Sequence, residues 1–292
     1  MWLIFALLSA ICFGLRGILY HWTSQQSAQR NMLLCGTFFM GGLISLVCSL
    51  VYQQDWTASA LVGIQMGLFS FVANASLFQG FKVGKASVVA ILTALPAVLV
   101  VIGAYFIWGE RLNLMQFIAF MIIVSGVLLV RYSNDISLQN LQGAQWGLIA
   151  LVLFAGNDLT GKWSTLLQAP MFPTLVFMFF TGTLCFGAGS LLDYRKQASK
   201  PVMLSGHKAA WSAKKTFLIG MGIGITNAVG MVLILTAFDN GKAGLVSAVA
   251  ALNVVIILLY TRFVVRDRFT RLETAGLVTA FAGILVMRLF GS

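Results

Sequence analysis

Two charged residues lie deep inside long apolar stretches, and their types suit them to bind a charged ligand. Arg16 lies within the stretch Trp2–Tyr20, and Asp158 within the stretch Trp146–Trp163. A charge at mid-bilayer costs about 2.5 kcal/mol or more, so such residues usually serve function. Arginine offers a planar fork of donors to an anionic group. Aspartate can hold an ammonium group or carry a coupling proton. We predict that Arg16 and Asp158 face one central cavity and bind substrate there, with Asp158 also as the proton-coupling residue.

Structural roles are the alternative for both residues. Asp158 and Lys162 are four positions apart, so on a helix they would be neighbours able to form a local pair. Arg16 could extend its side chain towards the membrane interface.

Neutral polar residues in the apolar stretches form a second group of candidates. An isolated asparagine in a membrane helix often only bonds a neighbouring helix, yet each of these could also touch substrate. The predicted substrate-binding set adds Asn74, Gln79, Thr93, Asn157, Asn227, Asn253 and Tyr260. Pro96 is the candidate hinge, because a proline inside a helix removes one backbone N–H.

The composition indicates which elements must position these residues. Of 292 residues, 59% are hydrophobic and only 9% are charged, where a soluble domain carries about 25% charged residues. About 20 mostly apolar residues cross a bilayer as a helix, and the apolar blocks lack the alternation of barrel strands. We predict an all-α membrane protein with about ten transmembrane helices. The expected spans are Trp2–Tyr20, Met32–Tyr52, Ala60–Phe78, Ala86–Trp108, Leu114–Val130, Trp146–Trp163, Phe172–Leu192, Phe217–Phe238, Ala243–Val265 and Leu272–Phe290.

The net charge of +11 is a topology signal in such a chain rather than a sign of nucleic-acid binding. The basic residues concentrate in the odd-numbered connections, above all in the one running from Tyr194 to Lys215. The positive-inside rule then places both termini outside the cytoplasm. The first stretch has no basic leader and no cleavage site, so we expect it to be retained as a span of the cytoplasmic membrane.

The two halves of the sequence resemble each other. A shift of 157 positions pairs Phe81 with Phe238, the triplet Gly84-Lys85-Ala86 with Gly241-Lys242-Ala243, and Gly126 with Gly283. A second shift, of 144, pairs Trp2 with Trp146. We predict two five-helix repeats, 1–131 and 146–292, joined by a connection at 132–145. Because five is odd, the second repeat must enter the bilayer from the opposite side, which is the inverted arrangement that supports alternating access.

The segments Ala94-Leu95-Pro96 and Gly109-Glu110-Arg111-Leu112 resemble those of the drug/metabolite transporter superfamily, EamA type. The fifth span supplies the expected glycine in Ser125-Gly126-Val127-Leu128. In the second repeat, Asn253 stands in place of the proline and Arg266-Asp267-Arg268-Phe269 in place of the turn. The resemblance implies two five-helix repeats and a transporter role.

We see no nucleotide-binding glycine loop, no Ser/His/Asp set and no cluster with metal-ligand spacing, so we predict neither an enzyme nor a resident cofactor or metal. The predicted function is secondary active or facilitative transport of a small organic metabolite, such as an amino acid or another zwitterion. The protein would work in the lipid bilayer as a monomer or homodimer, with protons as a possible coupling ion and no nucleic-acid partner. The alternatives are efflux of hydrophobic cations, flipping of a lipid or lipid-linked sugar, and a non-transporting partner subunit.

Overall fold

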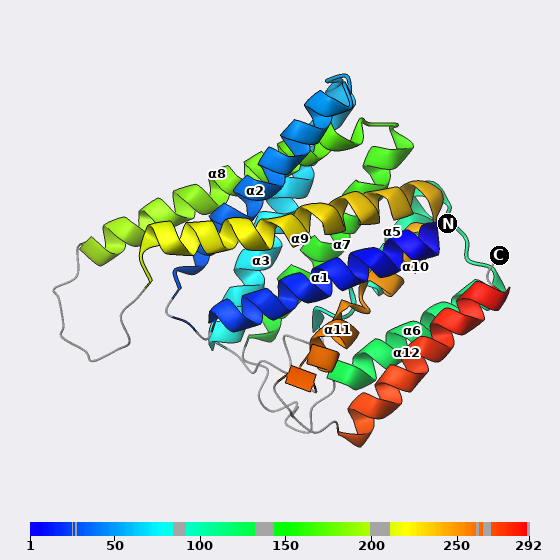
Figure 1. Cartoon of the computed structure of the whole chain (residues 1–292). Coiled ribbons are helices and arrows are strands. Elements are labelled where there is room, and N and C mark those ends of the chain that lie inside the picture. The colour runs from blue at the N-terminus through cyan, green and yellow to red at the C-terminus, as the bar shows by residue number, and fades with distance from the viewer. Residues whose placement is uncertain are drawn as a thin grey trace.

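The computed structural model describes residues 1–24, 26, 28–83, 92–131, 143–198, 211–260, 263–264 and 270–290. Within these ranges the fold is helical and contains no strand, as predicted (Figure 1). The elements are α1 (Trp2–Ser24), α2 (Arg30–Val51), the short 3-10 helix η1 (Ala58–Leu61), α3 (Val62–Val83), α5 (Pro96–Trp108), α6 (Leu114–Arg131), α7 (Ala144–Leu166), α8 (Met171–Ala198), α9 (Ala213–Asn240), α10 (Ala243–Ala250), α11 (Asn253–Tyr260) and α12 (Arg271–Phe290).

The helices run between two opposite ends of the molecule. We call the end that holds both chain termini the terminus end, on the right of Figure 1. We call the other the basic end, because Arg30, Arg195, Lys214, Lys215 and Arg271 lie at the helix ends there.

The two repeats have inverted topology, as predicted. A Cβ on Gly241 would contact Trp2, which begins α1. The backbone oxygen of the same glycine accepts a hydrogen bond from Lys162, near the end of α7. The first helix of one repeat therefore starts where the first helix of the other ends.

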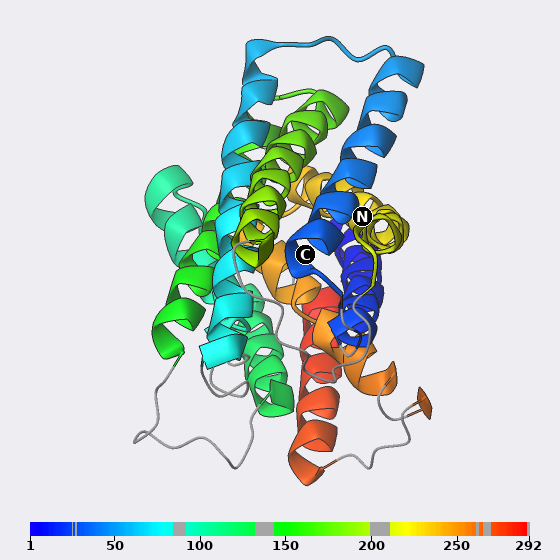
Figure 2. The ribbon, with the colours of Figure 1, turned by 90° about the vertical axis from the view of Figure 1, so that its left-hand side faces the viewer.

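Helices α6 and α12 pack against each other (Figure 2). They meet through two equivalent contacts, which the internal symmetry of the repeats relates to each other. A Cβ on Gly126 would lie 2.5 Å from the backbone nitrogen of Ala280, and one on Gly283 would lie 2.9 Å from that of Ile123. Gly126 and Gly283 are 157 positions apart, and so are Ile123 and Ala280. Small residues allow membrane helices to approach this closely.

Both helices also begin in the same way. Asn113 and Gln116 exchange backbone and side-chain hydrogen bonds at the start of α6. Thr270 and Glu273 do so at the start of α12. Each pair is a capping box, which satisfies backbone N–H groups that a helix start leaves unpaired.

Two predicted spans differ from the continuous helices expected. Pro96 is the first residue of α5 and follows a turn at Thr93–Ala94, so it does not kink a helix interior. A proline at this position loses no helical hydrogen bond. In the second repeat a turn at Ala251–Leu252 separates α10 from α11, which begins at Asn253. The spans break at matching positions of the two repeats.

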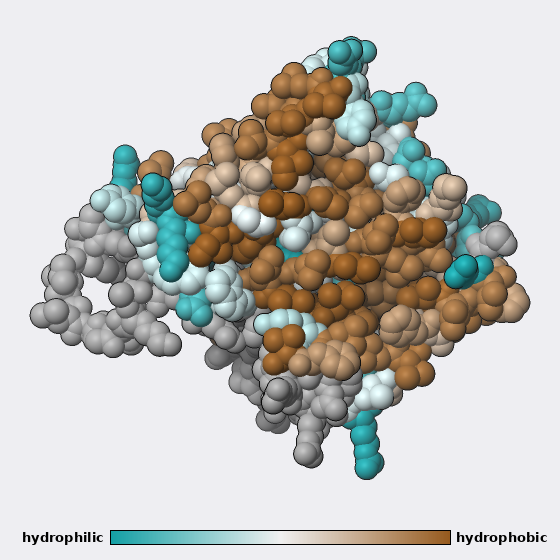
Figure 3. Space-filling view, viewed as in Figure 1, coloured by the Kyte–Doolittle hydropathy of each residue, from teal (hydrophilic) through white to brown (hydrophobic). Residues whose placement is uncertain are grey.

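Seven apolar helical spans within the described ranges are long enough to cross a membrane, with α10 and α11 counted together; α5 and α6 are shorter apolar helices. The outer surface fits this reading, because apolar side chains cover the middle of the molecule and hydrophilic ones gather chiefly towards its ends (Figure 3). Helices α8 and α9 have 28 residues each, about 42 Å, and exceed the predicted spans at both ends.

Several sequence features lie outside the described residues. These are the triplet Gly84-Lys85-Ala86, most of the connections 132–145 and 194–215, and the segment Arg266-Asp267-Arg268-Phe269.

Candidate functional site

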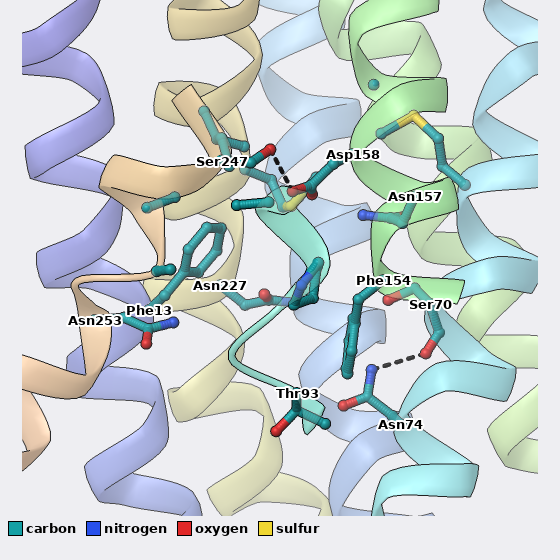
Figure 4. Close-up of a pocket in the computed structure, with 18 of the residues that line it drawn as sticks. Phe13, Ser70, Asn74, Thr93, Phe154, Asn157, Asp158, Asn227, Ser247 and Asn253 are labelled. Carbon is teal, nitrogen blue, oxygen red and sulfur yellow. Dashed lines mark hydrogen bonds between the residues drawn. The ribbon is translucent and has the colours of Figure 1, made fainter. Parts of the chain in front are cut away.

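A cavity of about 270 Å³ lies where the broken spans meet the middle of α1, α3, α7 and α9 (Figure 4). Its wall includes Thr93 and Pro96 from the first break and Ala251 and Asn253 from the second. The turns at Thr93–Ala94 and Ala251–Leu252 leave irregular backbone at membrane depth, which is tolerated where it lines a cavity. The inverted repeats therefore form this site jointly.

Arg16 lines the cavity from α1 and is held from the other repeat. Its Nη1 donates a hydrogen bond of 2.5 Å to Oδ1 of Asn227 on α9. The guanidinium carbon lies 4.7 Å from the centre of the Phe13 ring, within the range of a cation–π contact. Asn227 is only 2% exposed. The partners of Arg16 in these contacts are neutral, so its positive charge stays available to an anionic ligand.

Asp158 lines the cavity from α7, at the edge nearer the terminus end. Its Oδ2 accepts a hydrogen bond of 2.7 Å from Oγ of Ser247 on α10 (Figure 4). Lys162, the alternative partner on the same helix, instead forms an ion pair with Glu110. The negative charge of Asp158 is thus held by a neutral hydroxyl and stays available to a cationic ligand.

The cavity also contains acceptors that the described residues leave unused. The side-chain oxygens of Asn157 and Asn253 are buried and have no hydrogen-bond partner among the described residues. Asn74 donates through Nδ2 to the backbone oxygen of Ser70, at 2.7 Å. A buried polar atom without a partner costs about 1–3 kcal/mol. A ligand that donates hydrogen bonds to the side-chain oxygens of Asn157 and Asn253 would recover this energy.

The structure brings most of the predicted residues together. Those that line the cavity are Arg16, Asn74, Thr93, Asn157, Asp158, Asn227 and Asn253, with the hinge candidate Pro96. Gln79 and Tyr260 are not among the lining residues. Gln79 follows Asn74 by five positions and so points about 140° away on α3. Tyr260 shares a face with Asn253 but lies about 10 Å further along α11.

Ser70, Ser247 and the apolar part of the wall were not predicted. Phe13, Met66, Phe154 and Met231 line the cavity beside the polar groups. A single serine or an aromatic residue in an apolar span resembles many others that pack helices or face lipid. Nothing in the sequence around Ser247 separates it from these residues.

Comparisons with known proteins support this architecture. A model of the EamA-like transporter family matches residues 1–132 and 141–289. A solved crystal structure superimposes with a TM-score of 0.74 and 15% sequence identity, covering 99% of this chain and 97% of that chain. At this identity the likeness concerns the fold alone. No curated protein sequence matches the chain.

Proposed function

Because this chain belongs to the EamA-like transporter family, whose members move small molecules across membranes, we propose that it transports a small zwitterionic metabolite by alternating access. An amino acid is the simplest ligand of this class. One observation carries the proposal: a single cavity contains a guanidinium and a carboxylate, each bonded to a neutral partner on another helix.

The neutral partners explain how the cavity tolerates these charges when no substrate is bound. A buried charge needs hydrogen bonds to offset its lost hydration, and Asn227 and Ser247 supply them. A substrate carboxylate would take the place of Asn227 at Arg16. A substrate ammonium group would bind Asp158 and the free oxygen of Asn157. A cavity of about 270 Å³ admits a small metabolite but not a large amphiphile.

The proposed transport cycle uses the inverted repeats. Where two repeats meet around a midplane site, rocking of one against the other opens the site to each side in turn. The broken spans lie at the cavity wall, so the turns at Thr93–Ala94 and Ala251–Leu252 are the places where helix direction could change. Asp158 would carry the coupling proton if transport is proton-driven. We place the protein in the cytoplasmic membrane, as a monomer or homodimer.

Efflux of hydrophobic cations is the second candidate. The oxygens of Asn157 and Asn253 add acceptors beside Asp158, and Phe13 and Phe154 offer ring faces to an apolar cation. In that case Asp158 alone would bind the ligand, and Arg16 would keep only a structural role.

Counterflow in proteoliposomes tests both candidates with a panel of amino acids, amines and organic anions. We expect exchange of zwitterions that drops at least tenfold in Arg16→Ala and in Asp158→Asn. Gln79→Ala is the matched control, because it removes a polar side chain that does not line the cavity. Exchange of amines that survives Arg16→Ala would favour the efflux function. No exchange of any panel member by folded protein would refute both.

A further inference from the structure

A second polar cluster closes the cavity towards the terminus end, one helical turn beyond Asp158. At its centre is Lys162, which is only 7% exposed. Its Nζ donates to the backbone oxygens of Phe238, at 2.6 Å, and Gly241, at 2.8 Å. It also lies 3.6 Å from Oε1 of Glu110. Lys162 therefore occupies the carbonyl end of α9, where a positive charge is favourable.

Two further contacts join the repeats at the same level. Oε2 of Glu110 accepts a hydrogen bond from the backbone nitrogen of Ala243, at 2.9 Å. Nζ of Lys242 donates to the backbone oxygen of Arg111, at 2.5 Å, and to Oε1 of Gln116, at 2.7 Å. The turn between α5 and α6 of the first repeat is thus tied to the link between α9 and α10 of the second.

This cluster adjoins the cavity directly. Gly161 and Phe238 line the cavity, and Lys162 contacts the latter. Asp158 precedes Lys162 by one turn of α7, and Ser247 follows Ala243 by one turn of α10. The bond between Asp158 and Ser247 joins α7 to α10 directly. One turn nearer the terminus end, Glu110 joins the same two helices through its contacts with Lys162 and Ala243. A ligand that binds Asp158 in place of Ser247 removes one of these two polar connections between α7 and α10.

The chemistry of the cluster suits a contact that opens and closes. Burying an ion pair costs hydration that its attraction only partly returns, and apolar packing of the same volume is often more stable. When a charged contact separates into water, renewed hydration offsets much of what is lost. A polar closure between repeats can therefore have open and closed states of similar free energy.

We propose that Glu110, Lys162 and Lys242 form a gate that closes the terminus end of the cavity and separates when the cavity opens to that side. The gate rests on the proposed transport function. The alternative is that the cluster stays in place throughout transport and only caps the end of α9.

Cysteine labelling tests the gate without a known substrate. The reporter is Ile234→Cys, which lines the cavity, in a chain whose four native cysteines are replaced. Asp55→Cys, exposed at the terminus end, identifies the side to which a membrane-impermeant thiol reagent is added. From that side we expect Lys162→Met, which leaves the Glu110 carboxylate without its cation in the closed state, to raise the labelling rate of the reporter at least tenfold. Arg288→Met, which removes an exposed charge at the same end, should leave it unchanged. An unchanged rate in the folded Lys162→Met variant would overturn the gate.

A disulfide across the same closure gives a second measurement. A Cβ on Gly244 of α10 would lie 3.1 Å from Cβ of Val101 on α5, so a small outward shift of α10 would bring the two atoms to the roughly 3.5–4.5 Å of bonded cysteines. Oxidised Val101→Cys/Gly244→Cys should lock the terminus end, abolish labelling of Ile234→Cys from that side and recover it on reduction. Labelling that persists with the bridge formed would overturn the gate. Because both measurements follow access to the cavity, a failed zwitterion panel would leave their result unaffected.

Discussion

Arg16 and Asp158 each bond a neutral partner on another helix, and this choice of partner determines what the cavity can bind. If the partner of Arg16 were an acid, the guanidinium would already be neutralised and would have little affinity for a substrate anion. Asn227 instead satisfies one N–H group and leaves the charge in place. Asn227 differs from an aspartate only in its amide group, so a single substitution would turn this contact into an ion pair.

The variant Asn227→Asp should therefore convert the contact into a buried ion pair. We expect the half-saturation concentration for a transported zwitterion to rise at least tenfold, because its carboxylate must compete with a fixed one. Counterflow at increasing substrate concentration measures this change. Asn74→Asp adds the same charge elsewhere in the cavity and should have a smaller effect. An equal effect of both variants would show that net cavity charge, and not the Arg16 contact, controls affinity.

At the residue scale, depth in an apolar stretch was enough to find the charged residues but not their partners. Arg16 and Asp158 stand out because charges are rare there. Ser247 does not, since a hydroxyl is readily accommodated in a membrane helix. Lys162 could have paired with Asp158 by its spacing, yet it reaches Glu110 and α9. Such choices depend on the distance between helices, which local spacing does not contain.

Among the elements, the broken spans are the main difference from the sequence expectation. Residues 243–260 form one apolar stretch, so hydropathy predicts a single helix there. The turn at Ala251–Leu252 has no proline or glycine to mark it. Its counterpart before Pro96 does carry that mark, and the shift of 157 places Asn253 opposite Pro96. The alignment of the two repeats therefore indicated a break in this span, which hydropathy did not.

The pairing of α6 with α12 should be sensitive to a single methyl group. Because a Cβ on Gly126 would meet the backbone of Ala280, we expect Gly126→Ala to destabilise the protein by about 1–3 kcal/mol, the usual cost of overpacking. Thermal unfolding in detergent measures the change. Gly222→Ala is the control, since a Cβ there meets nothing within 4 Å; it should be neutral or slightly stabilising. A Gly126→Ala melting temperature equal to the control's would contradict the close contact.

For the whole molecule, the distribution of basic residues predicts orientation. The basic end carries Arg30, Arg195, Lys214, Lys215 and Arg271, and the sequence linking α8 to α9 adds Lys200 and Lys208. Against these, the terminus end carries Arg111, Lys162, Lys242 and Arg288. Basic connections stay in the cytoplasm, so both termini should lie outside it.

A reporter enzyme that is active only in the cytoplasm checks this orientation. We expect no activity when it is fused after Ser292 and full activity when it is inserted in the connection between α8 and α9. Equal expression of the two fusions, measured by immunoblot, is the control. The reverse pattern would place the termini in the cytoplasm and would invert the direction assigned to the gate.

The paired contacts of α6 and α12 have a meaning beyond stability. Gly126 meets Ala280 as Gly283 meets Ile123. The two helices therefore contact each other through equivalent surfaces, and the interface is self-complementary. Two separate half-length chains, inserted into the membrane in opposite orientations, would meet through the same pair of helices. The covalent link between the halves fixes in one polypeptide an association that a self-complementary ancestor of half the length could already have made.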